Sequence, residues 1–160
     1  MGDSGLTMTR FYGKFDYSVD SKGRVNIPAK FRKSLSQEAA ETFIICRSPG
    51  GCLRIYPQDS WNVYEEELLS RPQTPEVLEH RRLLFNSITD STLDAQGRVS
   101  LSPEQMAIAG IKKNVTMSGQ GDYIELWDTQ IYNDRYNVQR PDFDAVFFSS
   151  VKVQGPTSVR

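Results

Sequence analysis

The chain has 160 residues, a net charge of −1 at pH 7 and a hydrophobic fraction of 38%. This length allows one ordinary domain or two small ones, and the near-neutral charge excludes a polycation that coats nucleic acid without selectivity. Positive charge is concentrated in residues 10–33, which hold seven basic residues and two acidic ones. Such a region suits an anionic partner that binds in a defined orientation.

One motif occurs twice, 74 residues apart. Residues 18–28 read SVDSKGRVNIP, and residues 92–103 read TLDAQGRVSLSP. Both copies keep an Asp, a Gly and an Arg at the same spacing between short stretches of alternating apolar residues. This pattern is typical of a strand, a turn and a second strand. The sequence therefore predicts one structural unit that is repeated twice.

The first unit is expected to cover residues 11–71, after a loose lead at 1–10. Its apolar residues alternate in short stretches, which predicts strands that are joined by turns. These strands are expected at 11–19, 25–27, 42–46 and 52–56. Apolar residues at helical spacing predict helices at 29–35 and around 61–68. Asp59 or Ser60 would cap the second helix.

A linker at 72–87 is expected to join the two units. It should contain a helix over 75–86, because Thr74 can cap a helix that starts with Pro and an acidic residue. The second unit, 88–136, repeats the order of the first. Its strands are expected at 88–93, 99–101, 114–117 and 123–127.

The helices of the second unit carry recognisable end signals. Ser102 and Gln105 have the spacing of a capping box, and Gly110 is expected to end that short helix. Asp128 or Thr129 would cap a last helix.

The tail at 137–160 has no counterpart in the first unit. It is too apolar for a simple solvated tail because it contains Phe143, Val146, Phe147, Phe148 and Val151. Two prolines argue against one long helix. The alternatives are a short amphipathic segment that docks on the body or on a neighbouring molecule, and a disordered tail.

The sequence offers little for catalysis or for metal binding. Cys46 and Cys52 stand six residues apart, which matches no metal or redox pair, and they are expected to be buried and reduced. His80 is the only histidine and has no metal ligand at a suitable spacing. We therefore predict no enzyme activity, catalytic residue, metal, cofactor or small-molecule substrate. Since no stretch could serve as a signal peptide or span a membrane, a cytoplasmic protein is expected.

The repeated motif carries the candidate site. Asp20 and Asp94 can accept backbone N–H groups and hold their turns, while Gly23 and Gly97 can adopt the positive φ that closes each turn. These four residues are therefore expected to be structural.

Arg24 and Arg98 each allow two interpretations. A guanidinium can form an ion pair that braces the turn, or it can bind phosphates and the edge of guanine. For Arg24 we favour a role in DNA binding, with nearby lysines that hold phosphates, namely Lys14, Lys22, Lys30 and Lys33. For Arg98 we favour a structural role, because fewer basic residues surround the second motif.

Four stretches, taken in order, resemble the MraZ family: DSKGRVNIPAKFR at 20–32, GCLRIYPQDSW at 51–61, LDAQGRV at 93–99 and IELW at 124–127. The similarity covers about 11–136. It implies an α+β fold that is mainly β, made of a pseudo-twofold pair of AbrB-like β-hairpin barrel units with short helices.

The resemblance also implies a function. It implies a nucleoid-associated transcriptional regulator that binds short direct repeats in double-stranded DNA upstream of its own division and cell-wall gene cluster. The expected regulator represses this cluster and acts as a ring-shaped homo-oligomer. The family's Asp-x-x-x-Arg motif falls on Asp20 and Arg24, and it recurs at Asp94 and Arg98.

The main alternative is an oligomeric protein-interaction hub, or an antitoxin-like protein, without specific DNA binding. The basic residues between Lys14 and Lys33 favour the DNA-binding interpretation, because a protein-binding hub would not need them.

Overall fold

The structure is a computed structural model that describes residues 10–136 and 142–152. The expected loose lead therefore lies outside the described residues except for Arg10, as do the two outer parts of the tail. The strands are β1 (Phe11–Ser18), β2 (Arg24–Asn26), β3 (Thr42–Ser48), β4 (Cys52–Pro57), β5 (Thr89–Thr92), β6 (Arg98–Ser100), β7 (Asn114–Gly121) and β8 (Ile124–Asp128). The helices are α1 (Ala29–Lys33), the 3-10 helix η2 (Gln37–Ala39), α2 (Gln58–Ser70), α3 (Pro75–Asn86), α4 (Pro103–Ala109), α5 (Thr129–Tyr136) and α6 (Phe143–Lys152).

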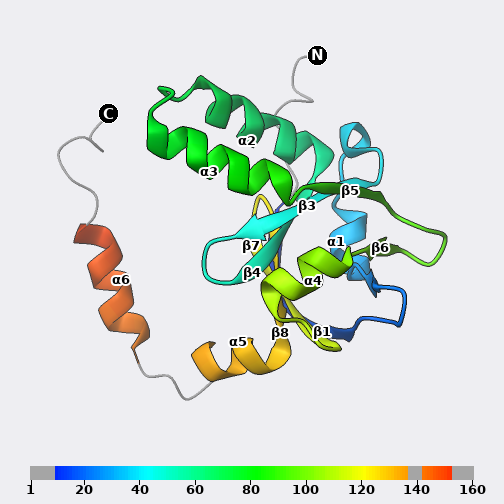
Figure 1. The fold of residues 1–160 in the computed structure, drawn as a ribbon. Coiled ribbons are helices and arrows are strands. Elements are labelled where there is room, and N and C mark those ends of the chain that lie inside the picture. The colour runs from blue at the N-terminus through cyan, green and yellow to red at the C-terminus, as the bar shows by residue number, and fades with distance from the viewer. Residues whose placement is uncertain (1–9, 137–141, 153–160) are drawn as a thin grey trace, which may run out of the picture.

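The main sheet is antiparallel and has the strand order β1-β7-β8-β4-β3-β5 (Figure 1). The first strand of each half pairs with the hairpin of the other half, because β1 pairs with β7 and β5 pairs with β3. Equivalent strands of the two halves occupy equivalent positions from the two ends of this order. The two halves are thus related by a pseudo-twofold axis between β4 and β8, and the expected α+β class is confirmed.

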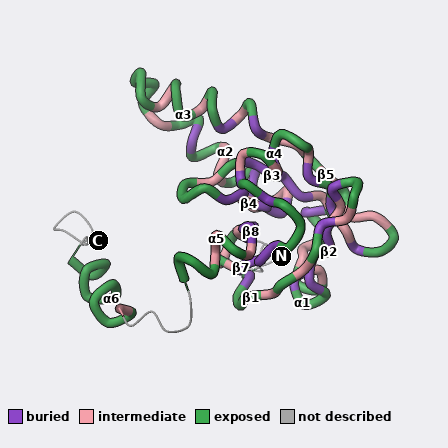
Figure 2. Tube along the Cα trace, turned by 60° about the horizontal axis from the view of Figure 1, so that its bottom comes forward, coloured by how far each residue is buried: buried purple, intermediate pink, exposed green. Residues whose placement is uncertain are grey.

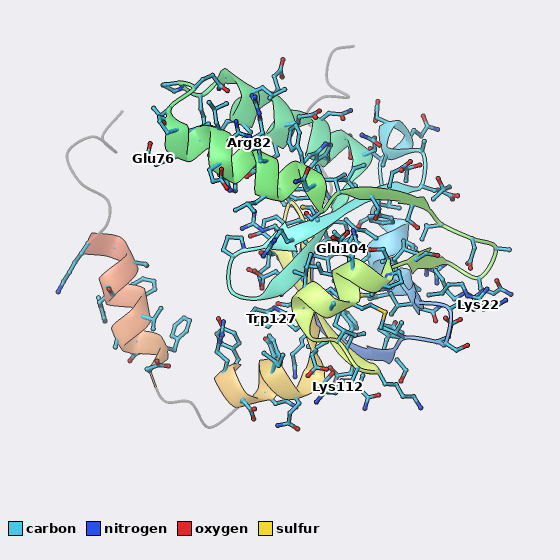
Figure 3. All side chains as sticks on the ribbon, in the orientation of Figure 1. Lys22, Glu76, Arg82, Glu104, Lys112 and Trp127 are labelled. Atoms are coloured by element: carbon cyan, nitrogen blue, oxygen red, sulfur yellow. The ribbon has the colours of Figure 1, made fainter. Side chains whose placement is uncertain are left out.

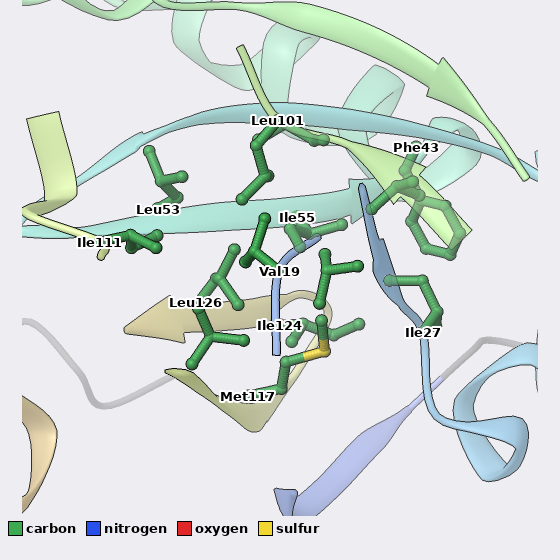
Figure 4. Close-up of a cluster of buried hydrophobic side chains, with 14 of the residues drawn as sticks. Val19, Ile27, Phe43, Leu53, Ile55, Leu101, Ile111, Met117, Ile124 and Leu126 are labelled. Carbon is green, nitrogen blue, oxygen red and sulfur yellow. The ribbon is translucent and has the colours of Figure 1, made fainter. Parts of the chain in front are cut away.

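Two apolar clusters cover the two faces of this sheet. Alternate residues of β3 and β4 point to opposite sides, as the strand geometry requires. On one side Phe43 and Ile55 join a large core with Val25, Val99 and Leu126. Figure 4 shows Val19 enclosed by side chains from several strands of this core.

The second cluster lies on the other side, under the pair of helices α2 and α3. Ile44 and Cys46 from β3 and Tyr56 from β4 pack there against Trp61 and Leu84. Both cysteines are buried free thiols, as expected.

Most of the expected helix ends are confirmed. The Thr74 side chain accepts the N–H of Val77 at the start of α3, and Ser102 and Gln105 form a capping box in α4. The expected cap of α2 is wrong, because this helix begins at Gln58 and its N-cap residue is Pro57. The carboxylate of Asp59 instead accepts a hydrogen bond from the Ser36 hydroxyl, which ties α2 to the segment before β3.

The tail contains α6, whose ten residues are all exposed (Figure 2). Its apolar side chains therefore do not dock on the body of the same chain, which corrects one of the two docking alternatives. Docking on a neighbouring molecule stays a prediction. Among the described residues, no helix has the length and apolar character needed to cross a bilayer.

Gln105 is a buried polar residue that links several elements by hydrogen bonds, and 1% of its surface is exposed. Its side-chain Nε2 donates to the carbonyl oxygens of Ile45 (3.1 Å) and Ser87 (2.9 Å) and to the Thr89 hydroxyl (3.0 Å). The equivalent position in the first half is Phe31, which packs edge-on against two other rings. One half thus fills this position with an aromatic ring and the other with a hydrogen-bonding amide.

We expect Gln105→Leu to lower the free energy of unfolding by about 2 to 4 kcal/mol, because two buried carbonyl groups lose their donor. Urea denaturation followed by circular dichroism measures this change. Gln37→Leu is the matched control, since Gln37 is exposed in η2. An equal effect of the two substitutions would show that the hydrogen bonds of the buried amide do not stabilise the fold.

Candidate nucleic-acid interface

Each copy of the repeated motif forms a turn around its Asp. Asp20 Oδ1 accepts the backbone N–H groups of Lys22 and Arg24, both at 2.9 Å, and Oδ2 accepts Arg24 Nε at 2.7 Å. Asp94 makes the same three contacts with Gln96 and Arg98. Each carboxylate therefore fixes both its turn and the first part of the following Arg side chain.

The two turns interlock through their glycines. Gly23 and Gly97 have φ values of 83° and 76°, which favour glycine. The carbonyl of Gly23 accepts the N–H of Leu101 at 2.8 Å, and that of Gly97 accepts the N–H of Ile27 at 3.0 Å. A Cβ on Gly23 would lie 2.6 Å from the carbonyl oxygen of Leu101. The close approach of the two motifs thus depends on these glycines.

The interlocked turns lead into a two-stranded ribbon. β2 and β6 are antiparallel, with Val25 opposite Val99, and both valines are buried in the core. The alternating residues therefore face outward, and these are Arg24, Asn26, Arg98 and Ser100. We call residues 20–26 and 94–100 the paired-turn ribbon. The fold brings the two arginines onto one face, although they are 74 residues apart.

The two arginines differ in how firmly they are held. Arg98 donates to Asp94 through Nε and to Gln96 through Nη2, and its Nη1 lies 3.6 Å from Asp20 Oδ2. Arg24 is bound to Asp20 through Nε. Within residues 10–136 and 142–152, its two terminal nitrogens have no hydrogen-bond partner. The side chain of Arg24 is 35% exposed and that of Arg98 22%.

The predicted phosphate-binding lysines are all exposed, but they do not gather around one turn. Lys22 lies on the first turn, and Figure 3 shows it far from Arg82 on α3. Lys14 lies on β1, with its Nζ 5.6 Å from the centre of the Tyr132 ring.

Lys30 and Lys33 belong to α1, which contacts the second turn. Arg32 of this helix lies so close to Gly97 that an added Cβ there would stand 2.8 Å from its guanidinium. Helix α1, which carries Lys30 and Lys33, thus lies beside the second turn, although the sequence places it after the first.

A further lysine, which was not predicted from the sequence, lies beside the first turn. The carbonyl of Lys113 accepts the N–H of Val19 at 2.8 Å, and the equivalent contact in the other half comes from Glu41. The two adjacent lysines at 112 and 113 were a visible signal. Only the pairing of β1 with β7 brings them to this turn.

The carboxylates of Asp20 and Asp94 have lowered pKa values. The main cause is the hydrogen bond from the backbone N–H of the following Arg, and the Arg side chain and one more N–H lower the pKa further. A carboxylate with a lowered folded-state pKa stabilises the fold above its unfolded pKa of about 3.9. This contribution is lost as the pH falls through the folded pKa.

We expect the double variant Asp20→Asn, Asp94→Asn to be less stable than wild type at pH 7, and the difference to shrink as the pH falls below about 4. Urea denaturation between pH 7 and pH 2.5 measures it. Asp90→Asn, on the exposed side of β5, is the control for removing a carboxylate. A difference that does not change with pH would show that charge at these turns does not stabilise the fold.

The chain was compared with known proteins. A family model described as "MraZ protein, putative antitoxin-like" matches residues 11–81 and 84–146. A protein of Burkholderia cenocepacia named "Transcriptional regulator MraZ" is 34% identical over 123 residues, which cover 77% of this chain and 85% of that protein. Proteins of the same name from Nitrosomonas europaea and a Polaromonas species are 38% and 36% identical, over 74% and 76% of this chain and 80% and 84% of their own lengths. The chain therefore belongs to the MraZ family.

Proposed function

We propose that this protein is a sequence-specific DNA-binding transcriptional regulator that represses its own division and cell-wall gene cluster. Its relatives carry the name of a transcriptional regulator. The observation that carries the proposal is the state of Arg24. Asp20 orients its guanidinium through Nε, and the two terminal nitrogens face outward from the paired-turn ribbon without a partner among the described residues.

A guanidinium held in this way suits base recognition. Its two terminal nitrogens can donate together to O6 and N7 of guanine in the major groove. The major groove also admits a two-stranded β ribbon. Because Asp20 has already ordered the side chain, little conformational entropy remains to be lost on binding. In this proposal Arg24 reads bases and Arg98 braces the ribbon.

The lysines around the ribbon would position the DNA by its phosphates. Lys22 belongs to the first turn, the backbone of Lys113 is bonded next to it, and α1 with Lys30 and Lys33 lies beside the second turn. A duplex laid across the ribbon would therefore meet positive charge on both sides. Lys14 on β1 extends this surface. Such contacts carry no sequence information, and they make binding depend on salt.

We also propose that the protein acts as a ring-shaped homo-oligomer on short direct repeats, bound to DNA in the nucleoid. In this view residues 11–71 and 88–136 are two AbrB-like units, joined by a linker at 72–87 and followed by a tail at 137–160. A single ribbon offers few base contacts. Several ribbons on one particle that meet several DNA repeats would raise the affinity through effective concentration.

The rival function is a hub that binds proteins without specific DNA binding. The exposed apolar side chains of α6 favour it, since an unpartnered apolar helix face suits a protein partner. The two functions differ in what substitution of Arg24 does to DNA selectivity.

We expect Arg24→Ala to reduce the preference for the upstream DNA over scrambled DNA about 5-fold to 150-fold, because a bidentate contact to guanine contributes about 1 to 3 kcal/mol of discrimination. Arg24→Lys keeps the charge but loses the planar donor pair, so it should lose most of the preference while retaining binding to both DNAs. Fluorescence anisotropy with both DNAs over a salt series measures these effects.

Arg82→Ala is the control for removing one positive charge, since Arg82 is an exposed residue on α3. It should leave the preference unchanged. Circular dichroism and gel filtration must show that each variant keeps its fold and oligomeric state. If wild type and Arg24→Ala both bind the two DNAs equally, Arg24 is a turn brace and the rival function gains support.

The proposal of repeated sites makes a separate prediction. A DNA fragment with several repeats should bind at least tenfold more tightly than a fragment with one repeat, since the later contacts form within one complex. Anisotropy on fragments of equal length measures this ratio. Equal affinity for both fragments would contradict the oligomeric mechanism and would leave base reading by Arg24 untouched.

A further inference from the structure

A pocket of about 220 Å³ lies on the face of the sheet that α2 and α3 cover, opposite to the face on which the paired-turn ribbon packs. Strands β3 and β4, the turn between them and the two helices contribute to its walls. The lining residues include Arg54, Tyr56, Tyr64, His80 and Leu84. The wall thus combines the Arg54 guanidinium with aromatic and aliphatic surface.

Arg54 is half-buried here and is held by neutral groups. Its Nε donates to the Ser48 hydroxyl and its Nη1 to the Tyr56 hydroxyl, both at 3.0 Å. The centre of the guanidinium lies 4.2 Å from the centre of the Tyr123 ring, within the range of a cation–π contact. The guanidinium is therefore fixed in position before any ligand arrives.

No carboxylate of the described residues neutralises this guanidinium. Glu125 lies opposite Arg54 on β8, but its Oε1 accepts a hydrogen bond from Trp127, and it forms no ion pair with Arg54 within 4.0 Å. Burial raises the pKa of Tyr56 to about 12 and that of Cys46 to about 12, so both groups are neutral at pH 7. The hydrogen-bond partners of this guanidinium are therefore neutral at pH 7.

The remaining donor of Arg54 is available to a ligand. Nη2 has no hydrogen-bond partner in the part of the chain that the structure describes. It is not fully buried either, so a ligand can reach it. Arg47 also lines the pocket, but strand alternation turns its exposed side chain to the opposite face of β3 from Cys46. Arg54 therefore supplies the guanidinium of this small pocket.

We propose that this pocket binds a small organic anion, whose carboxylate or phosphate group contacts Arg54 and whose apolar part packs against Tyr56, Tyr64 and Leu84. The volume is below the roughly 300 to 1,000 Å³ of sites for drug-sized ligands, so a single ring or a short chain is the right size. Such a ligand would touch both β4 and α3, and it would hold the helix pair against the sheet.

The test uses three probes with the full-length protein and without DNA, so its result is independent of the proposed DNA binding. Benzoate and phenyl phosphate carry the two anionic groups, and benzamide is the neutral analogue of benzoate. Calorimetry measures affinity, and ¹H–¹⁵N NMR follows the Arg54 Nε–H and the backbone N–H groups of residues 46–48 and 80–84.

We expect the anions to bind and to shift these signals, and benzamide to bind at least tenfold more weakly, since charge-assisted hydrogen bonds contribute about 1.5 kcal/mol or more. The stronger of the two anions identifies the preferred group. Arg54→Gln should weaken binding about tenfold, and Arg54→Lys should weaken it less because it keeps the positive charge. Arg82→Gln, also a loss of one Arg but outside the pocket, should have no effect.

Three results would overturn the proposal: equal binding of benzamide and benzoate, no binding of either anion at millimolar concentration, or binding that Arg54→Gln leaves unchanged. If Arg54→Gln does not fold, the comparison of benzoate with benzamide still supports or contradicts the proposal, because it needs no variant.

Discussion

The pairing of β1 with β7 and of β5 with β3 is the constraint on which the rest of the molecule depends. Without this exchange, each half would hold one hairpin and one unpaired strand. A lone hairpin is at best marginally stable in water, and unpaired backbone groups are costly when buried. The exchange joins both halves into one sheet with a core shared between them. Neither half satisfies its own backbone, so the repeated units of the sequence are not separate folding units.

The same exchange creates the candidate DNA-binding surface. Each turn follows a strand that pairs with the hairpin of the other half. The two turns therefore lie side by side and exchange hydrogen bonds through Gly23 and Gly97. The ion pair between Arg98 and Asp20 crosses between the halves. Residues from one motif alone would give an isolated turn. The ribbon face therefore belongs to the whole fold rather than to either repeat.

Local features of the fold could be predicted from the sequence, since they depend on neighbouring residues. The helix caps at Thr74 and Ser102 and the two hairpins are examples, because side-chain chemistry and apolar spacing determine them locally. The cap of α2 could not be predicted in the same way. Asp59 has the right chemistry, but Ser36 takes up its carboxylate and the helix begins before it.

Features that depend on the exchange of strands could not be predicted from the sequence. Lys113 reaches the first turn and α1 reaches the second because of pairings between residues about a hundred positions apart or between the halves. The contacts of Arg54 with Ser48 and Tyr56 form within one hairpin, but they depend on the register in which β3 and β4 pair. Apolar periodicity in one sequence reports which face of an element is buried, but not which element buries it.

The two halves share a fold, but equivalent positions hold side chains of different chemistry. Polar side chains have more structural contacts in the second half. In the first half the position after the ribbon holds Phe31 in the core, and in the second half Gln105 uses the same position to bind the backbone of β3 and the end of α3. On the surface, Lys22 corresponds to Gln96, and Arg98 is held by more partners than Arg24. In the second half, the side chains of Gln105 and Arg98 thus mainly stabilise the fold. A chain with one available guanidinium on its ribbon has a single candidate side chain for base contacts, so recognition of a longer DNA site would require several chains.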